Sequence, residues 1–421
     1  MKLASACLGL LGLLAPLAGS AAPLSLEAAI QLAMQSNPGM VIAAADQDIA
    51  DAQLRQARSA ALPQVVVVAQ ANRGNADLGG YFGFGRQTAE PRSAAVELRQ
   101  PLYAGGAIWA GIDQAKQALG AAQANTQSSR LRLAVQAVQV YGAVLSARTM
   151  VEQTARYLAA ASEIARSAAL RFEAGEIPRS DWALAQSREA EGQAQVAQAA
   201  AVLATAAANF QATIGTDAQE LLPLPAVAAP TTDTSALLTL AEQTNSDLAA
   251  ARAAAEAARN GIQIAQAKRL PSLTLTARAS SVRDEFLPGY RAQGNTIGIE
   301  GKWNLYTAGA TSASLDAARA SARRAEAQLA QQQSQLRGAV LSTVALLRSN
   351  ETAVRAAAVQ LDASDQALTS LRHEVRVGQR PLLDLLDAER DRLTAALSLA
   401  TARAALCTTA WQLAALTGQT P

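Results

Sequence analysis

Two hydrophobic patterns alternate along the chain, and each of them occurs in both halves. In residues 272–280 the apolar Leu273, Leu275 and Ala277 alternate with polar residues, and the same period of two recurs in residues 93–102 and 296–305. Residues 64–72 fit less well, because residues 65–68 are all valine. Alternation with period two is typical of half-buried strands. The pattern therefore predicts four strands, at about 63–73, 93–103, 271–283 and 294–306.

Helical patterns fill most of the remaining chain. A helix of moderate length precedes each strand pair, a very long helix follows it, and a final helix comes after a short break. The expected ranges are about 39–61, 107–171 and 180–213, then 247–269, 310–374 and 382–416. At 1.5 Å per residue, each very long helix would extend about 100 Å, which exceeds the diameter of a compact domain of this size. Their sparse large apolar residues among Ala, Gln and Ser favour coiled-coil packing.

The two halves are related by an internal repeat. Pro63 and Pro271 are 208 residues apart, whereas Gly175 and Gly378 are 203 residues apart. The net difference of five residues falls between the two strands of the first half, where a surface loop would accept it. We expect a signal peptide over 1–22, a first repeat over 23–219, a linker over 220–235 and a second repeat over 236–421.

The first 22 residues have the features of a secretory signal peptide. Lys2 is followed by an apolar run over residues 3–17 and then by small residues up to Ala22. This run is shorter than the roughly 20 residues that span a bilayer, and Cys7 within it is interpreted as a signal residue and not as a lipidation site. Later apolar stretches are interrupted by charged or amide residues, so we expect membrane contact of the mature chain to be made by strands.

The strands have two possible environments. One is a water-soluble antiparallel sheet with one wet face. The other is a transmembrane barrel, which needs strands of 9–11 residues, an apolar outer face, a polar lumen and aromatic girdles. The residues expected to face the lumen are Glu97, Arg99, Arg278, Glu300 and Lys302. The aromatic residues in or beside the strands are Tyr81, Phe82, Phe84, Tyr103, Phe286, Tyr290, Trp303 and Tyr306. Open strand edges are not tolerated in lipid, so several copies would have to join, and three copies would supply twelve strands.

The amino-acid composition argues against several classes of function. Beyond the signal peptide the chain has one cysteine, Cys407, and one histidine, His373, so clusters of these residues cannot form. The net charge of +2 gives no electrostatic basis for binding nucleic acid. We therefore expect no enzyme activity, no cofactor, no metal site and no nucleic-acid partner. Cys407 is expected to be a small packing residue, and His373 an ordinary residue at a helix end.

Several short motifs resemble the TolC family of outer-membrane factors, also called outer membrane efflux proteins. They are residues 26–33 with Asn37-Pro38, the Leu-Pro pairs at 62–63 and 270–271, the Leu-Tyr pairs at 102–103 and 305–306, and residues 383–388 after Val377-Gly378. The resemblance covers essentially the whole mature chain and recurs in both halves. A lipobox is absent, which distinguishes this chain from the lipidated branch of the family.

This resemblance implies a fold with mixed all-α and transmembrane β parts: a trimeric 12-stranded β-barrel continued by a periplasmic α-helical barrel. The implied function is a passive exit duct of a tripartite efflux or type I secretion system, located in the outer membrane and extending into the periplasm. The implied partners are a homotrimer, a periplasmic adaptor (membrane fusion) protein, an inner-membrane transporter and outer-membrane lipid. Two alternatives stay open. A stand-alone porin should lack the very long helices, and a periplasmic coiled-coil scaffold should lack the strand pairs.

Asp384 and Asp387 are the first candidates for a gate. They lie three residues apart after Pro381, so they share a face in the first turns of a helix. Their effect could be limited to stabilising the helix macrodipole, but three copies would place six carboxylates around a narrow tunnel end. The resemblance places the family's constriction at these aspartates and its tip arginine at Arg380. Asp181, the repeat mate of Asp384, is either a further gate residue or an N-cap.

The helix reversals are the second candidate site. Gly175 and Gly378 stand where a very long helix must reverse, and a positive φ is expected at both. The resemblance implies that the two tips dock the adaptor through their backbone, at Gly175-Glu176 and Gly378-Gln379.

Overall fold

The computed structural model describes residues 23–77, 79, 85–226, 233–285 and 289–418. The predicted signal peptide with Cys7 lies outside these residues, as do Tyr81, Phe82, Phe84 and Phe286. The chain divides into two compact units. Of the described residues, the tip unit contains 23–33, 137–226 and 357–404, and the sheet unit contains 34–77, 79, 85–136, 233–285, 289–356 and 405–418.

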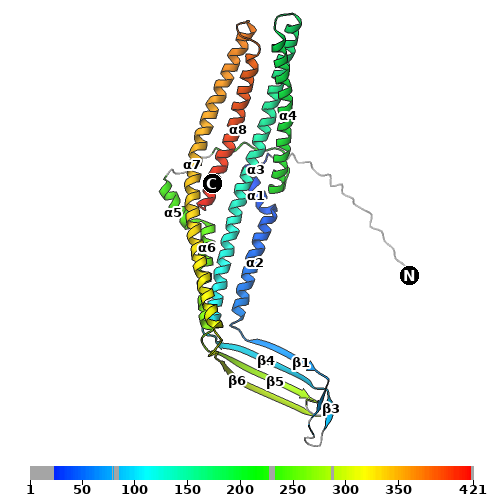
Figure 1. The fold of residues 1–421 in the computed structure, drawn as a ribbon, viewed down its shortest axis with the longest axis vertical. Coiled ribbons are helices and arrows are strands. Elements are labelled where there is room, and N and C mark those ends of the chain that lie inside the picture. Colours follow the sequence, from blue (N-terminus) through cyan, green and yellow to red (C-terminus); the bar gives the residue numbers. More distant parts are fainter. Residues whose placement is uncertain (1–22, 78, 80–84, 227–232, 286–288, 419–421) are drawn as a thin grey trace, which may run out of the picture. The chain divides into compact units, whose positions relative to one another are not determined.

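The secondary-structure elements occur in the same order in the two halves of the chain, apart from two short strands. The first half contains α1 (Leu26–Ser36), α2 (Pro38–Ser59), β1 (Gln64–Ala71), β2 (Gly74–Asp77), β3 (Arg86–Ala89), β4 (Arg92–Tyr103), α3 (Ala107–Glu173) and α4 (Arg179–Ile214). The second half contains α5 (Thr234–Thr244), α6 (Ser246–Ala267), β5 (Ser272–Arg283), β6 (Arg291–Lys302), α7 (Ala310–Arg376) and α8 (Asp384–Leu416). Figure 1 shows these elements along the chain.

All six predicted helices are confirmed to within two residues at each end, and so are three of the four predicted strands. The fourth prediction, 294–306, is wrong at both ends, because β6 covers Arg291–Lys302. Lys302 pairs with Ser272, the first residue of β5. The preceding Pro271 has no N–H to extend the ladder, so the chain leaves the sheet after Lys302. The helices α1 and α5 and the strands β2 and β3 were not predicted.

Asparagine side chains determine where α2 and α6 begin. The side-chain oxygen of Asn37 accepts a hydrogen bond from the Gly39 N–H at 2.8 Å, and Pro38 occupies the first helical position. Asn245 accepts from the Leu248 N–H at 3.0 Å. Each cap satisfies one of the backbone donors that a helix start leaves without an intrahelical partner. The amide of Asn245 also donates to the Leu416 carbonyl, which attaches the end of α8 to the start of α6.

The sheet unit contains a four-stranded antiparallel sheet with the order β1-β4-β5-β6 (Figure 1). The register places every second residue of all four strands on the same face. One face carries Val65, Val67, Leu98, Leu275 and Ile297, together with Ala69, Val96, Leu273, Ala277 and Ile299. This apolar face is largely exposed in the single chain. The outer edges of β1 and β6 have no strand partner among the described residues.

The short strands β2 and β3 continue the β1–β4 ladder. Ala71 pairs with Arg92, and Gly74 pairs with Ala89 in an unchanged register. Between them, the Asn72 N–H donates to the Pro91 carbonyl at 2.9 Å. The five extra residues of the first half were expected in a plain surface loop. The segment that contains them instead includes a paired ribbon.

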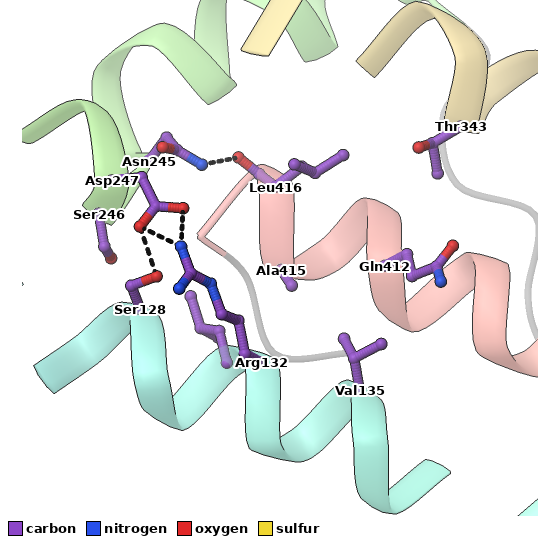
Figure 2. A pocket seen from close by; sticks show the side chains of 11 residues that line it. Ser128, Arg132, Val135, Asn245, Ser246, Asp247, Thr343, Gln412, Ala415 and Leu416 are labelled. Atoms are coloured by element: carbon purple, nitrogen blue, oxygen red, sulfur yellow. Dashed lines mark hydrogen bonds and ion pairs between the residues drawn. The ribbon is translucent and has the colours of Figure 1, made fainter. Parts of the chain in front are cut away.

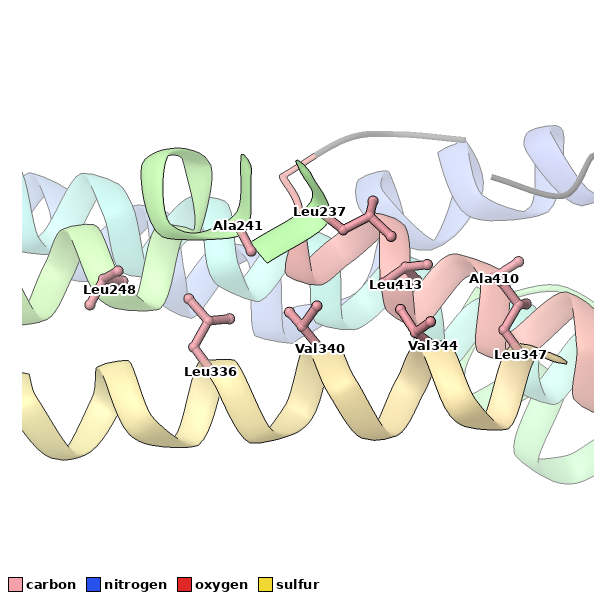
Figure 3. Packing of buried hydrophobic residues seen from close by; sticks show 9 residues of the cluster. All are labelled: Leu237, Ala241, Leu248, Leu336, Val340, Val344, Leu347, Ala410 and Leu413. Carbon is pink, nitrogen blue, oxygen red and sulfur yellow. The ribbon is translucent and has the colours of Figure 1, made fainter. Parts of the chain in front are cut away.

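A hydrophobic core of the sheet unit lies along α7 and includes residues from the C-terminal part of α8 (Figure 3). Leu336, Val340, Val344 and Leu347 follow one another at spacings of three or four residues, which keeps them on one helix face. They pack against residues of α5, α6 and α8, namely Leu237, Ala241, Leu248, Ala410 and Leu413.

Among the described residues, α8 is the one helix that is long and apolar enough by composition to cross a membrane. By composition alone, α8 is therefore an exception to the expectation that only strands of the mature chain suit a membrane. Its apolar residues have another explanation, because Leu413 and Ala410 are buried against α7 and Leu386 is buried in the tip unit.

The N-terminal segment and the linker meet on α3 in the tip unit. Leu24 and Leu221 form a parallel bridge, and the hydroxyl of the buried Tyr141 lies 2.8 Å from the Leu24 carbonyl and 2.7 Å from the Leu222 carbonyl. Arg148 donates to the carbonyls of Ala218 and Gln219. The predicted linker, 220–235, is thus fixed at its start, and α5 begins within it, at Thr234.

A cavity of about 350 Å³ lies in the sheet unit where α3, α6 and α8 meet (Figure 2). At its edge, Arg132 donates to both carboxylate oxygens of Asp247, at 2.8 and 2.9 Å. Ser128 donates to the same carboxylate at 2.6 Å. Because these donors already satisfy Asp247, the cluster connects α3 with the first turn of α6, and we assign it a structural role.

Candidate gate at the helix tips

Both very long helices end in the same backbone motif in the tip unit. At the end of α3, the Gly175 N–H donates to the Phe172 carbonyl at 3.0 Å, and the Glu176 N–H donates to the Arg171 carbonyl at 2.8 Å. This pair of bonds is a Schellman motif, which requires a left-handed residue after the helix. Gly175 has φ +75°, as predicted, and a side chain there would strain the backbone.

The end of α7 repeats this arrangement. The Gly378 N–H donates to the Val375 carbonyl at 3.1 Å, and the Gln379 N–H donates to the backbone carbonyl of Glu374 at 2.9 Å. Gly378 has φ +77°, which confirms the second prediction of a positive φ. The two tips, which we call the α3–α4 tip and the α7–α8 tip, therefore reverse the chain in the same way.

The tips differ in the residues that follow the glycine. In the α3–α4 tip, α4 begins directly after Pro178, which is the N-cap residue. The interpretation of Asp181 as an N-cap is therefore wrong, because proline has taken that position and Asp181 lies within the helix. In the α7–α8 tip, α8 begins only at Asp384, three residues after Pro381. Consecutive i→i+3 hydrogen bonds, from Asp384 to Pro381 and from Leu385 to Leu382, form that segment.

Aromatic stacking holds the α3–α4 tip together. The rings of Phe172 and Trp182 lie 5.1 Å apart with an angle of 9° between their planes. Trp182 and Ile177 also pack against an apolar cluster that includes Ala168 and Leu386. Such a contact depends on apolar surface and ring geometry, so salt should affect it little.

Ion pairs take the equivalent place in the α7–α8 tip. The Arg380 guanidinium lies 3.4 Å from the Glu374 carboxylate at the end of α7 and 3.5 Å from the Asp384 carboxylate at the start of α8. Arg380 thus connects the two helices across the turn. The prediction that this arginine contributes to the tip was made without Glu374, which the sequence pattern did not single out.

Asp387 has two arginine neighbours. Its carboxylate lies 3.6 Å from Arg390, one turn along α8, and 3.9 Å from Arg188 on α4. Arg188 also donates to Glu191 at 2.8 Å, and this hydrogen bond raises the pKa of its guanidinium. The i,i+3 spacing of Asp387 and Arg390 could have been read from the sequence. The approach of Arg188 could not, because α4 and α8 are far apart along the chain.

Carboxylates nevertheless outnumber the cations in the groove between α7 and α8. This groove has a volume of about 600 Å³, and its charged lining consists of Glu374, Asp384, Asp387, Asp391 and Arg380. Four carboxylates face one guanidinium there, so the groove attracts cations. Within the described part of the chain, no group of three or more His, Cys, Asp or Glu residues could hold a metal ion.

Asp181 is not part of this groove. Its carboxylate accepts a hydrogen bond from the neighbouring Ser180 at 3.2 Å, and among the described ion pairs it has none with Arg380 or Arg188. The structure of a single chain therefore brings Asp384, Asp387 and Arg380 together but leaves Asp181 separate.

A buried tyrosine lies close to the arginines of this region. The Tyr157 side chain on α3 is almost fully buried, and its hydroxyl has no hydrogen-bond partner among the described residues. Burial raises the pKa of the Tyr157 phenol, and the negative charge of Glu191 raises it further. The phenol therefore stays neutral at physiological pH and contributes no charge to the tip.

The five charged strand residues that were predicted to face the lumen lie on one face of the sheet. Glu97 pairs with Arg278 across β4 and β5, and Glu300 and Lys302 occupy the same face of β6. Arg99 donates to Glu97 at 2.6 Å. All five lie on the face opposite the apolar one, and their position in a lumen stays a prediction.

Comparisons with known proteins agree with this architecture. The sequence profile of the family "Outer membrane efflux protein" matches residues 29–216 and 237–419. The chain is 26% identical over 397 residues to the outer membrane efflux protein BepC of Brucella suis, covering 94% of this chain and 85% of BepC. It is 27% identical over 392 residues to the outer membrane protein TolC of Vibrio cholerae, covering 88% and 85%.

Solved structures share the fold. The CmeC outer membrane channel of Campylobacter jejuni has a TM-score of 0.84 at 15% identity, over 93% of this chain and 85% of that one. The family match spans both halves of the chain, including both tips and all four strands of the main sheet. The chain therefore belongs to the outer membrane efflux protein family, whose members are channels of the bacterial outer membrane.

Proposed function

We propose that three copies of this chain form the exit duct of a tripartite efflux or type I secretion system in the outer membrane. The sheet carries this proposal. It has one largely polar face and one largely apolar face, and both of its outer edges lack a strand partner among the residues that the structure describes. An open edge in lipid leaves backbone groups without hydrogen bonds, at a cost of several kcal/mol each. Closure with other copies removes this cost, and three copies supply the even number of twelve strands.

The mature chain contains the parts that a passive duct needs. Energy would come from an inner-membrane transporter, reached through a periplasmic adaptor, so the chain itself needs no catalytic group. We place adaptor docking at the two tips, around Gly175-Glu176 and Gly378-Gln379, where the Schellman turns present backbone at the end of each helix pair. The signal peptide (1–22), the two repeats (23–219 and 236–421) and the linker (220–235) belong to the same proposal.

We assign the periplasmic gate to Asp384, Asp387 and Arg380, with Asp181 as a further candidate. Three-fold symmetry would bring six aspartates to the tunnel end. The ion pairs with Arg380, Arg390 and Arg188 refine this proposal, because they neutralise part of the aspartate charge within each chain. The remaining negative potential favours cations at the constriction.

Fractionation and bilayer recording test the duct. The expected result is a heat-modifiable trimer in the outer-membrane fraction that forms ion-conducting pores in planar bilayers. Recovery of a monomer in the soluble periplasm would contradict the proposal and support a coiled-coil scaffold. A trimer that exports cargo without an adaptor and transporter would support a stand-alone porin. Purified chain with hydrolytic activity would contradict the passive role.

A further inference from the structure

We propose that a pocket at the end of β6 binds the phosphate of an anionic glycerophospholipid in the periplasmic leaflet of the outer membrane. This inference rests on the proposed function, because it requires the sheet to span that membrane. The pocket has a volume of about 350 Å³. It is lined by Arg269, which follows α6, and by most of the segment 303–312, which leads from β6 into α7 (Figure 1). We call it the junction pocket.

The junction pocket contains one positive charge and no negative charge. Arg269 is its cation, and no acidic residue belongs to its lining. Among the described ion pairs, none involves Arg269. The donors of its guanidinium are therefore available to a ligand. A guanidinium binds phosphate oxygens with two parallel hydrogen bonds, so a phosphate group is the anion that suits this residue.

Polar groups at the start of α7 add to this anion site. α7 begins at Ala310, and neither the N–H nor the hydroxyl of Ser312 has a partner among the described residues. The hydroxyls of Thr307 and Thr311 lie 2.8 Å apart at the same turn. N–H groups at a helix N-terminus favour phosphate. Because Arg269 comes from a different element, two separate parts of the chain converge on the site.

Exposed apolar side chains beside the pocket suit the acyl part of a lipid. Trp303, Leu305 and Tyr306 are 60%, 79% and 88% exposed. The Trp303 indole N–H donates to the Arg269 carbonyl at 3.0 Å, so the ring lies next to the arginine. These residues follow Lys302, the last residue of β6, where the proposed barrel would meet the periplasm. Trp and Tyr are enriched at this depth of a membrane, beside the lipid head groups.

The first half of the chain forms the same turn without this chemistry. The Gln100 amide donates to the Ala61 carbonyl at 2.9 Å, just as Trp303 donates to Arg269. The other polar residues of the pocket have mainly apolar counterparts, at the repeat offsets of 208 and 203. The matched pairs are Arg269 with Ala61, Thr307 with Ala104, Thr311 with Ile108 and Ser312 with Trp109. The turn therefore needs neither the cation nor the hydroxyls, and folding alone does not explain them.

One residue keeps the junction pocket open. In the first half, a Cβ on Gly105 would lie 2.8 Å from the Ala267 carbonyl oxygen, so the second half closes over that junction tightly. Ala308 occupies the equivalent position in the second half, with φ +49°. Because its Cβ prevents so close an approach, a neighbouring protein segment could not seal the junction pocket in the same way. Space for a ligand remains.

The charges of the pocket discriminate between phospholipids. The ammonium group of phosphatidylethanolamine would find no carboxylate in the lining. Phosphatidylglycerol carries a phosphate without a cation. Lys268 adds a second positive charge nearby, since its Nζ lies 3.1 Å from the Ser314 hydroxyl and it makes no ion pair among the described residues. Basic pockets beside membrane-spanning segments bind anionic head groups, so we expect phosphatidylglycerol to bind more tightly.

Native mass spectrometry of the purified full-length trimer tests this site. With dioctanoyl-phosphatidylglycerol as the probe, the trimer should retain up to three lipids, one for each chain. Arg269→Gln should weaken binding about tenfold, because a charge-assisted contact with the phosphate is lost. This variant should still fold, since the structural contact of Arg269 is made by its backbone carbonyl. Unchanged binding by Arg269→Gln in an intact trimer would overturn the proposal.

Two matched variants control for charge and position. Arg269→Lys keeps the charge and loses the two-pronged contact, so it should bind more weakly than the wild type and more tightly than Arg269→Gln. Arg58→Gln removes an exposed arginine near the end of α2, which lies outside the pocket lining and has no described ion pair. Its binding should match the wild type. An equal loss in Arg58→Gln would show non-specific attraction to charge and overturn the site.

Three further outcomes identify the occupant. Inorganic phosphate in large excess should displace little lipid, because it cannot contact Trp303 and Leu305. Complete displacement would indicate a site for free phosphate and overturn the lipid assignment. Dioctanoyl-phosphatidylethanolamine bound as tightly as phosphatidylglycerol would overturn the anionic preference. If Arg269→Gln instead weakens the trimer and leaves lipid retention unchanged, a neighbouring copy fills the pocket and the proposal is wrong.

Failure of this inference is distinguishable from failure of the proposed function. An intact trimer that conducts ions in planar bilayers but shows no preference for phosphatidylglycerol would overturn the lipid site alone. A chain that forms no trimer and no pore would contradict the proposed function.

Discussion

The α3–α4 tip and the α7–α8 tip reverse the chain with the same hydrogen bonds but are held by different forces. Stacked aromatic rings, Phe172 and Trp182, support the first. Ion pairs of Arg380 with Glu374 and Asp384 support the second. Apolar stacking is largely independent of salt, whereas exposed ion pairs contribute little and are screened by it. The two tips therefore share a backbone and differ in how readily they should open.

This difference assigns separate tasks to the tips. The α3–α4 tip is suited to remain in place, because opening it would expose aromatic surface to water. The ion pairs of the α7–α8 tip can exchange partners at low cost, because its arginine and carboxylates are already exposed. If the duct opens at its periplasmic end, we expect α7 and α8 to move and α3 and α4 to stay.

The largest expected effect follows from removing the aspartates of the α7–α8 tip. In Asp384→Ala with Asp387→Ala, a trimer loses six carboxylates. At about 0.5 kcal/mol for each interaction with a bound cation, block by a multivalent cation should weaken about a hundredfold. Single-channel conductance should also rise, and planar bilayers measure both quantities.

The matched control for this test is Asp181→Ala in the α3–α4 tip. It should change the block much less, because Asp181 lies outside the acidic groove. If cation block is unchanged in the double variant, the gate does not lie at Asp384 and Asp387. An equal effect of Asp181→Ala would remove the proposed difference between the tips.

A second prediction concerns the aromatic stack. Trp182→Ala should lower the local stability of the α3–α4 tip by about 2 kcal/mol, because a partly buried ring and its stacking contact are lost. Amide hydrogen exchange at residues 170–184 should then accelerate about 30-fold, with equal acceleration at low and high salt. If exchange accelerates equally in residues 373–381, which lie outside the apolar cluster around Trp182, the stack is not local to its own tip.

A third prediction addresses the property that the tips share. Gly175→Ala and Gly378→Ala should each destabilise the local turn by about 1 kcal/mol, because a Cβ disfavours the left-handed conformation. No neighbouring atom lies within 4 Å of a Cβ at either glycine, so strain is the only expected cost. Hydrogen exchange should accelerate to a similar extent in the two tips. A clear difference would show that the turns are not equivalent.

The smallest effect is expected for Arg380→Gln. This change removes two exposed ion pairs and should destabilise the α7–α8 tip by about 0.5 kcal/mol at low salt. The effect should disappear at 1 M salt, where the Debye length is about 3 Å. Hydrogen exchange at several salt concentrations measures it. An effect that persists at high salt would point to packing of the arginine stem and not to its charge.

Much of the fold could be predicted from the sequence because its patterns are local. The period-two alternation in 272–280 and the long runs without proline or clustered glycine are each visible without tertiary information. The ends of β6 could not be predicted in this way. Trp303 continues the alternation in the sequence, but the partner strand has already ended, since Pro271 precedes Ser272.

The candidate gate was predicted only in part, for a similar reason. Asp384, Asp387 and Arg380 lie within eight residues of one another, so one motif was sufficient to identify them. Arg188 approaches Asp387 from another helix, and Glu374 approaches Arg380 across the turn. The assignment of Asp181 as an N-cap failed because Pro178 sets the start of α4. Contacts between helices depend on rotation about the helix axis, which residue spacing alone does not define.

The joining of two hairpins in one chain has a consequence for assembly. A ring of six hairpins made from separate molecules would need five encounters, and each would lose translational and rotational freedom worth at least about 4 kcal/mol. Three chains that each carry two hairpins need only two encounters, because the β4–β5 contact forms within one molecule. In the proposed trimer, the covalent connection would therefore raise the effective concentration of one hairpin near the other, and it would help a ring to form from chains that are dilute in the periplasm.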